Sequence, residues 1–136
     1  MKPRFRVVSA GHTTTERAAL VVARKSSIPY EKLRGSADRR GTKTSVYDAW
    51  LDRNFACSDG TLVLGLGQPP QRKGAIDRAI GRHDDTPALW VAVKWDGNVP
   101  ATRDWIRRKR IKVLHVTGNA PYRLSAEFLR QVLKGE

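Results

Sequence analysis

Short, mostly apolar runs alternate with segments of helical spacing along this chain of 136 residues. The runs that we expect to be strands are 5–10, 28–33, 61–64, 88–93 and 111–116. The segments that we expect to be helices are 16–25, 45–56, 73–82, 100–109 and 125–134, the last with Ser125 as its cap. Apolar strands separated by helices are typical of a parallel sheet that is covered on both sides. The sequence therefore predicts a single α/β domain over residues 1–136, built as a three-layer, doubly wound and mostly parallel sheet.

The chain is strongly basic, with 26 Lys and Arg residues against 13 Asp and Glu residues, a net charge of +13. This balance favours anionic partners such as a small phosphorylated ligand or a nucleic acid, although a general effect on solubility is the alternative. No apolar run approaches the roughly 18 residues of a membrane span, so we expect no membrane partner. The single cysteine excludes an internal disulfide and a cysteine-cluster zinc site. We expect a cytoplasmic location, no metal site, and assembly as a homo-oligomer.

The turn after the first expected strand, from Ser9 to Thr15, combines a glycine with several hydroxyl side chains at a helix start. Backbone N–H groups and the positive end of the helix dipole make such a turn a ready site for an anion. The alternative is that the threonines only cap the helix. The candidate phosphate-binding residues in and after this turn are Ser9, Gly11, His12, Thr13, Thr14 and Arg17.

A second glycine-containing loop, from Gly65 to Gly74, follows the strand expected at 61–64. Its glycines let the backbone approach a ligand, and Arg72 and Lys73 add positive charge, although a flexible loop with solvated charges is an equally good interpretation. We expect the two loops to follow neighbouring strands and to face each other across one crevice, where such sheets bind ligands. The candidates in this loop and after the last strand are Gly65, Gly67, Lys73, Gly74 and Gly118.

The stretch Ser9–Leu20 has the sequence S-A-G-H-T-T-T-E-R-A-A-L and resembles the S-G-G-Q-T-G-x-D-R-A-A-L opening of the molybdenum(-cofactor) carrier family. Residues 47–64, including Tyr47 and Asn54, align without gaps with that family's Y-R-E-R-T-E-W-N-V-R-D-S-D-x-T-L-I-L stretch. Residues 112–118, K-V-L-H-V-T-G, are similar to its closing strand, I-x-V-L-N-V-A-G. The resemblance covers nearly the whole chain. It implies a Rossmann-like nucleotide-binding fold of the lysine-decarboxylase-like, SLOG-type superfamily.

The same resemblance implies binding of a nucleotide or of a phosphorylated, pterin-type cofactor, such as the molybdenum cofactor, at the carboxyl edge of the sheet. The first turn departs from the family pattern at four positions. Ala10 and Thr14 stand in place of glycines, His12 in place of glutamine, and Glu16 in place of aspartate. The Cβ atoms at positions 10 and 14 narrow the space for a phosphate and restrict φ.

Known catalytic signatures are missing from the sequence, among them H-E-x-x-H, G-x-S-x-G and S-x-x-K. The P-G-G-x-G-T-x-x-E pattern of the phosphoribohydrolases in the same superfamily is also missing. Asp77 is the one acid that closely follows Gly74, and its spacing differs from that motif. We therefore expect a binding protein without evident catalytic machinery, and its catalytic residues stay unassigned. The alternative, by superfamily analogy alone, is a hydrolase of nucleotides or N-glycosidic bonds.

The three histidines and the single cysteine are further candidates for a chemical role. His12 lies at the expected ligand edge, where it either contacts a phosphate or serves only as a turn residue. We expect His83 to have a loop or capping role at a helix end. We expect His115 to be packed or edge-exposed in a strand, and Cys57 to be buried at a helix end.

A basic cluster points to nucleic-acid binding as an alternative function. It lies in and just after the helix expected at 100–109, with further basic residues near the start of the chain. Phosphate contacts by such residues dominate nucleic-acid affinity and weaken with salt. A solvated basic helix face is the alternative interpretation. The residues are Arg103, Arg107, Arg108, Lys109, Arg110 and Lys112, together with Lys2, Arg4 and Arg6.

Overall fold

The computed structural model describes residues 5–34, 46–66, 74–94 and 98–134. The elements, in chain order, are β1 (Arg6–Ser9), α1 (Thr14–Lys25), β2 (Tyr30–Lys32), α2 (Val46–Ala56), β3 (Gly60–Gly65), α3 (Ala75–Arg82), β4 (Ala88–Ala92), α4 (Asn98–Arg108), β5 (Val113–Gly118) and α5 (Tyr122–Val132). Each expected strand and helix is present, with ends that differ by a few residues. None of the helices in these ranges is long and apolar enough to cross a membrane.

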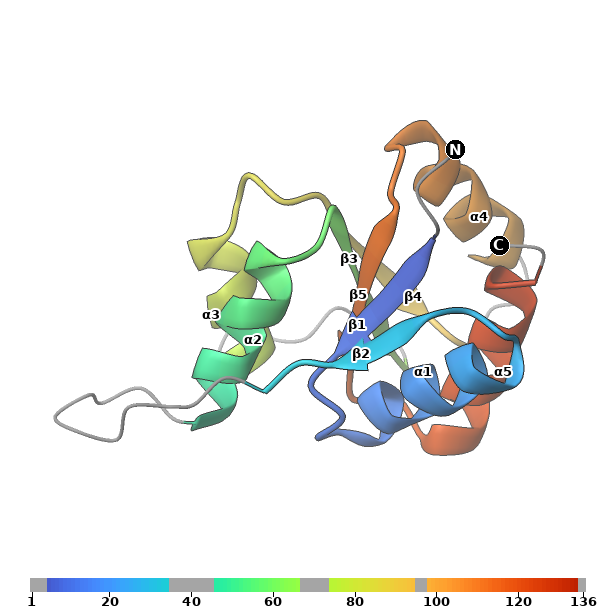
Figure 1. The fold of residues 1–136 in the computed structure, drawn as a ribbon, viewed down its shortest axis with the longest axis horizontal. Coiled ribbons are helices and arrows are strands. Elements are labelled where there is room, and N and C mark those ends of the chain that lie inside the picture. The colour runs from blue at the N-terminus through green and yellow to red at the C-terminus, as the bar shows by residue number, and fades with distance from the viewer. Residues whose placement is uncertain (1–4, 35–45, 67–73, 95–97, 135–136) are drawn as a thin grey trace, which may run out of the picture.

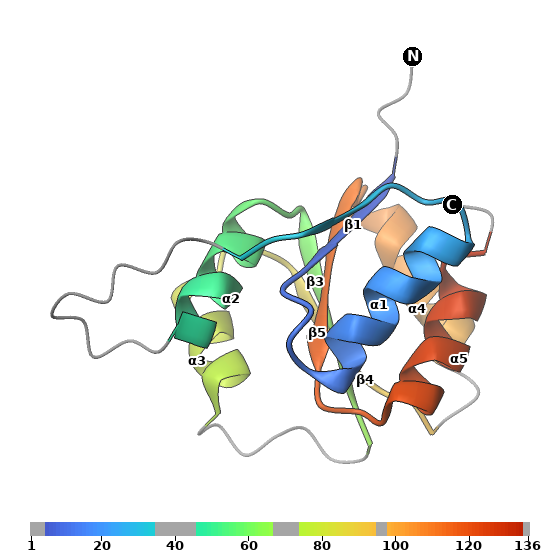
Figure 2. The same cartoon turned by 60° about the horizontal axis from the view of Figure 1, so that its bottom comes forward.

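The five strands form one parallel sheet in the order β2-β1-β5-β3-β4. Helices α1 and α4 both pack on α5 over one face of the sheet, and α2 packs on α3 over the other (Figure 1, Figure 2). Two helical layers therefore enclose the sheet. The predicted single α/β domain with a three-layer, doubly wound, Rossmann-like architecture is confirmed.

The last strand of the chain, β5, lies at the centre of the sheet between β1 and β3. Leu114 pairs with Val7 on one side, and Val116 pairs with Leu62 on the other. The expectation that the two glycine-containing loops follow neighbouring strands is therefore wrong. After β4 the chain crosses back over β3 before it enters β5. The pattern of apolar residues along the sequence does not predict such a crossover.

The hydrophobic core has a larger and a smaller part, one on each face of the sheet. The larger part, under α1, α4 and α5, includes the buried side chains of Leu62, Leu114 and Leu129. The smaller part, under α2 and α3, includes Leu51 and Phe55. Each such side chain contributes about 1.5–3 kcal/mol when it leaves water, so the sheet is held from both sides.

The two helices that pack most closely, α1 and α5, begin in different ways. Helix α1 begins with a capping box, in which Glu16 N donates to Thr13 Oγ1 and Thr13 N donates to Glu16 Oε1. Helix α5 begins after Pro121, so the prediction of Ser125 as its cap is wrong. The Ser125 hydroxyl lies 3.0 Å from Thr15 Oγ1 in a buried contact, where it joins α5 to α1.

Candidate ligand-binding site

The carboxyl ends of β3 and β5 mark a point where the chain changes sides of the sheet. After β5 the chain enters α5 on one face, whereas after β3 it continues to α3 on the other. Adjacent strands whose connections leave in opposite directions open a crevice, and open α/β sheets bind ligands there. The turn after β1 leads to α1 on the same face as α5, so β1 does not border this crevice.

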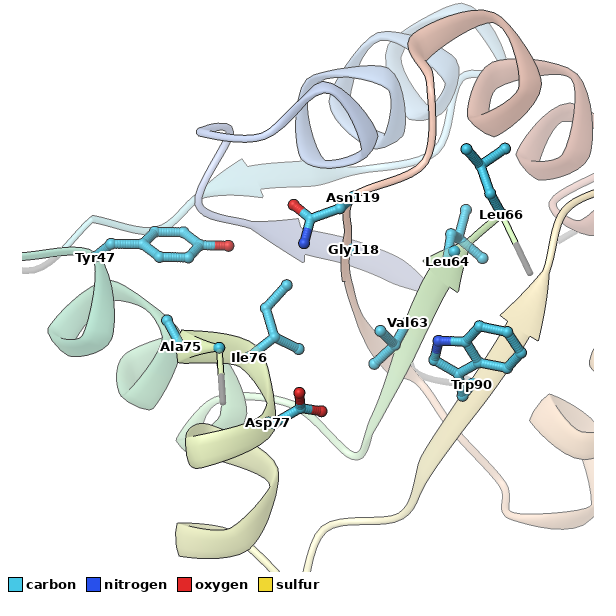
Figure 3. A pocket seen from close by; sticks show the side chains of 12 residues that line it. Tyr47, Val63, Leu64, Leu66, Ala75, Ile76, Asp77, Trp90, Gly118 and Asn119 are labelled. Atoms are coloured by element: carbon cyan, nitrogen blue, oxygen red, sulfur yellow. The ribbon is translucent and has the colours of Figure 1, made fainter. Parts of the chain in front are cut away.

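A cavity of about 380 Å³ lies at this place (Figure 3). The ends of β3 and β5 border it, together with the first turn of α3 and the side chains of Tyr47 and Trp90. Most of the lining side chains are apolar, whereas Asp77 and Asn119 add a carboxylate and an amide. Figure 3 shows the Tyr47 hydroxyl and the Asn119 amide turned towards the space between α3 and the sheet.

Two glycines shape the strand ends that border the cavity. Gly118 has a φ of 139°, and a Cβ built on it would lie 2.1 Å from the carbonyl oxygen of Leu64. Only glycine permits this approach of β5 to β3. A Cβ on Gly65 would lie 2.9 Å from Cζ2 of Trp90, so this glycine lets the indole ring lie against the strand end.

The first turn of α3 presents backbone rather than side-chain groups to the cavity. Gly74 is the N-cap of α3 and forms no side-chain capping bond. The first N–H groups of a helix have no partner within the helix and carry the positive end of its dipole. A Cβ on Gly74 would meet no atom of the described residues within 4 Å, so these residues leave space beside the turn. The turn is suited to an anionic group, although the Asp77 carboxylate already lies in it.

The turn between β1 and α1, where we expected a phosphate, holds a carboxylate of the protein itself. Glu16 is fully buried, and its Oε1 accepts 2.9 Å hydrogen bonds from the backbone N–H groups of His12 and Thr13. Its Oε2 accepts 2.7 Å hydrogen bonds from the hydroxyls of Tyr47 and Thr117. Burial and the nearby Glu16 carboxylate raise the pKa of Tyr47 above its usual range, so the hydroxyl stays protonated.

The candidate phosphate-binding residues of this turn lie on the far side of β5 from the cavity. The hydroxyls of Ser9 and Thr14 donate to backbone carbonyls in and after β5, at 2.8 and 2.7 Å. Gly11 has a φ of 68°, which favours glycine, and Arg17 is exposed on α1. None of the candidates from this turn lines the cavity formed by the described residues. Ligand binding by Ser9, Gly11, His12, Thr13, Thr14 and Arg17 therefore stays a prediction.

The candidates from the second loop and the last strand are brought together by the fold. Gly65, Gly74 and Gly118 all line the cavity, although they are far apart in the sequence. Gly67 and Lys73 lie outside the described residues. A role in ligand binding stays a prediction for all five residues.

Sequence reasoning did not single out Tyr47, Trp90 or Asn119 as site residues. Tyr47 entered only as one position of the family resemblance, and Trp90 lies in a run that indicates a buried strand. One signal could have pointed to Tyr47 and Trp90: both are aromatic residues on elements that border a carboxyl strand end. Their convergence depends on the strand order, which the local pattern does not give.

Packing between side chains fixes the conformation of the first turn. Arg34 donates hydrogen bonds of 2.7 and 3.0 Å to two carbonyls of this turn. Its guanidinium lies 4.5 Å from the centre of the Trp50 ring, a cation–π arrangement. The ring of His12 lies 4.7 Å from that of Tyr47 and 6.0 Å from that of Trp50. His12 is thus an exposed residue whose ring contacts two aromatic rings.

His115 is fully buried in β5 and cannot take up a proton at neutral pH. Its Nδ1 lies 3.0 Å from Thr61 Oγ1, and its Nε2 has no hydrogen-bond partner among the described residues. Burial, with a smaller effect from His83, lowers the pKa of His115 to about 3. Of the two positions expected for His115, packed or edge-exposed in a strand, the structure shows the packed one.

The remaining candidates for chemistry have structural positions. His83 is the C-cap of α3 and bonds to Asp52 at 2.8 Å, as expected of a capping residue. Cys57 is exposed, so the prediction that it is buried is wrong. It falls in the turn after α2 ends at Ala56, where the helix no longer holds a side chain against the core. The described residues contain no group of three or more His, Cys, Asp or Glu side chains that could hold a metal ion.

The basic residues considered for nucleic-acid binding lie towards the end of α4 and in its connection to β5. Arg108 pairs with Asp104 at 2.7 Å, and Arg103 donates to the carbonyl of Lys134 at 3.2 Å. Arg6 begins β1, whereas Lys2 and Arg4 lie outside the described residues. The exposed members of the cluster are Arg6, Arg107, Arg108, Lys109, Arg110 and Lys112.

No family model and no curated protein matches the sequence. A solved structure is similar over 96% of this chain and 96% of its own, with a TM-score of 0.73 and 24% sequence identity. It is the crystal structure of a protein from Syntrophus aciditrophicus described as a putative molybdenum carrier protein. At 24% identity this likeness shows that the two proteins share the α/β fold.

Proposed function

We propose that the protein binds a small phosphorylated ligand of the nucleotide or pterin type in the cavity between β3, β5 and α3. The observation that carries this proposal is the position of the cavity at the switch point of a parallel sheet, beside an uncapped helix N-terminus. The carrier-family resemblance implies the same ligand class. Membership of the SLOG-type superfamily and assembly as a homo-oligomer belong to the same proposal.

The cavity has two kinds of wall, which suit the two parts of such a ligand. Apolar and aromatic side chains, including Trp90 and Ile76, suit a flat heterocycle. The backbone of the first turn of α3 suits the phosphate. A volume of about 380 Å³ falls within the usual range for a small-molecule site, roughly 300–1,000 Å³.

Binding accounts for the cavity better than catalysis does. The titratable side chains that line it are Asp77 and Tyr47. The pKa of Tyr47 is raised, so its hydroxyl is a poor base and nucleophile at neutral pH. No lining side chain is a histidine, a cysteine or a lysine among the described residues. A carrier or sensor of the ligand therefore fits these residues better than a hydrolase.

Isothermal titration calorimetry with nucleoside monophosphates and a pterin phosphate tests the proposal. Ala75→Asp places a negative charge in the first turn of α3, where it suits the helix dipole but repels a phosphate. Ala101→Asp makes the same change near the start of α4, which does not border the cavity. We expect Ala75→Asp to weaken binding by about tenfold or more, and Ala101→Asp to leave it unchanged.

Three results would contradict the proposal. One is the lack of any heat of binding at about 1 mM ligand, a concentration that detects even weak sites. Another is equal binding of the phosphorylated ligand and its dephosphorylated counterpart. The third is full affinity in the Ala75→Asp variant.

A further inference from the structure

The edge of the sheet opposite the cavity carries basic residues at two of three adjacent strand starts, and helix ends add further basic residues to this row. Val7 N donates to the carbonyl of Pro29 at 3.0 Å, and Arg6 N donates to the carbonyl of Lys112 at 2.8 Å. These bonds place the starts of β2, β1 and β5 side by side. Tyr30, Arg6 and Lys112 therefore follow one another along this amino edge.

The helices add further positive charge to the same edge. Helices that connect parallel strands run opposite to them, so α1 and α4 both end at the amino edge. Arg24 and Lys25 lie in the last turn of α1, and Arg107 lies in the last turn of α4. Basic residues at helix ends are stabilised by the helix dipole. Arg6 and Lys112 lie outside the helices, so the dipole does not explain the row as a whole.

Within the described ranges, acidic side chains form no ion pair with the members of this row that lie at the strand starts. Among the residues that the structure describes, none forms an ion pair with the exposed Arg6, Arg107 or Lys112. Asp59, at the start of β3, accepts 2.9 Å hydrogen bonds from the backbone N–H groups of Lys112 and Val113. Its carboxylate therefore bonds to the main chain rather than to a basic side chain.

An aromatic side chain is exposed at the end of the row. Tyr30 begins β2 and is 46% exposed, although its strand partner Val7 is fully buried. Of the large hydrophobic residues that are exposed in the described chain, Leu66 and Tyr122 lie at the carboxyl side. An exposed ring on the same edge as basic residues that form no ion pair within the described chain is a combination that suits single-stranded nucleic acids, in which bases stack and phosphates pair with charges.

We propose that the amino edge binds single-stranded nucleic acid, with phosphates on the basic row and a base stacked on Tyr30. This function goes beyond the small-ligand site, which lies at the opposite edge. A stretch of acidic protein fits the edge less well, because protein interfaces require an apolar centre and Tyr30 is the one exposed large hydrophobic residue that the described residues place at this edge. A duplex keeps its bases stacked inside and would leave Tyr30 unused.

Fluorescence anisotropy with a labelled oligothymidylate of about 12 nucleotides tests this proposal, at several salt concentrations. Tyr30→Ala is expected to weaken binding by about tenfold, and Tyr30→Phe to preserve it. Tyr122→Ala removes a ring of similar exposure, 42%, at the start of α5 and is expected to have no effect.

The basic row has its own matched pair of variants. Lys112→Gln is expected to reduce the slope of log K against log salt by about 0.7, the value for one phosphate contact on a single strand. Arg123→Gln removes the same charge from a side chain that is 90% exposed at the other edge, and the slope is expected to stay unchanged.

Any one of four outcomes would overturn the proposal. The first is no binding at low salt. The second is equal weakening by the control variants. The third is undiminished affinity in Tyr30→Ala, and the fourth is binding of a duplex or of polyglutamate as tight as that of the single strand. Ala75→Asp is expected to leave oligonucleotide binding intact, so failure at one edge is distinguishable from failure at the other.

Discussion

The hydroxyl of Tyr47 donates a 2.7 Å hydrogen bond to Oε2 of Glu16, and this bond joins α2 to the first turn of α1 across the end of β5. Glu16 is fully buried, and a buried carboxylate is tolerated only when its oxygens are hydrogen-bonded. The bond also fixes a side chain that lines the cavity. The wall of the candidate site is thus positioned by a carboxylate that is not part of it.

Tyr47→Phe is expected to lower the free energy of unfolding by about 1–3 kcal/mol, because Glu16 loses one of its four donors. Urea denaturation at neutral pH measures this loss. The raised pKa of Tyr47 stabilises the folded state fully below pH 10, the usual tyrosine value, and less as the pH rises above it. The decline in stability above pH 10 should therefore be shallower in Tyr47→Phe. A loss no greater than that of Tyr122→Phe would contradict the role of the bond.

Gly118→Ala is expected to destabilise the protein by about 3 kcal/mol or more, because its φ of 139° and its contact with the Leu64 carbonyl exclude a Cβ. Gly81→Ala is the matched control. Gly81 lies inside α3, and a Cβ there would meet nothing within 4 Å. It is expected to stabilise the protein by up to about 1 kcal/mol. Thermal unfolding of the two variants measures the contrast, and similar melting temperatures would contradict it.

His115 makes the folded state sensitive to acid. Its pKa is about 3 in the folded protein against 6.5 in the unfolded chain, so between these values the unfolded chain binds the proton more tightly. The contribution of His115 to the free energy of unfolding is complete above pH 6.5. As the pH falls below this value, the contribution decreases by up to about 1.4 kcal/mol for each pH unit. His115→Leu should therefore lose stability less steeply than the wild type between pH 6.5 and 4. Equal slopes, or an imidazole resonance of His115 that titrates near pH 6 in NMR spectra, would show that the ring is not held neutral.

Asp77→Asn is expected to raise the affinity for a phosphorylated ligand by about tenfold, a prediction that depends on the proposed function. The carboxylate lies in the first turn of α3, where it opposes a second negative charge. Calorimetry should show no such gain for the dephosphorylated ligand. Asp104→Asn makes the same change on α4 and serves as the control. Weaker binding in Asp77→Asn would mean that the carboxylate accepts a hydrogen bond from the ligand and that the phosphate lies elsewhere.

Much of the fold was predictable, because it is encoded in patterns of a few residues. The β-branched run around Val7 and Val8 indicates β1, and Thr13 with Glu16 forms the capping box that such a sequence predicts. The strand order was not predictable, since the insertion of β5 depends on packing between distant segments. The same limit explains the wrong prediction for Ser125, whose hydroxyl bonds to α1 instead of capping its own helix.

The sequence predicts a candidate site at the carboxyl edge of the sheet. It does not predict which strands border that site. The rule that ligands bind at carboxyl strand ends pointed to Gly65, Gly74 and Gly118, which line one cavity and whose role in ligand binding stays a prediction. The amides and the glycine of the first turn fit an anion, and the sequence does not show which anion occupies the turn. The anion in this turn is the carboxylate of Glu16, which accepts hydrogen bonds from two backbone N–H groups. The sequence predicts that Glu16 takes part in the helix cap, but it does not show that the same carboxylate takes the place of a bound anion.

The central place of β5 determines when this molecule can fold. Until residues 113–118 leave the ribosome, β1–β2 and β3–β4 are two detached strand pairs whose inner edges have nothing to bond to. Phe128 and Leu129, which follow on α5, then seal the larger core. We therefore expect the sheet to form late in synthesis, once β5 is available to join the two strand pairs. A chain that terminates before β5 is expected to aggregate rather than to form a stable fragment.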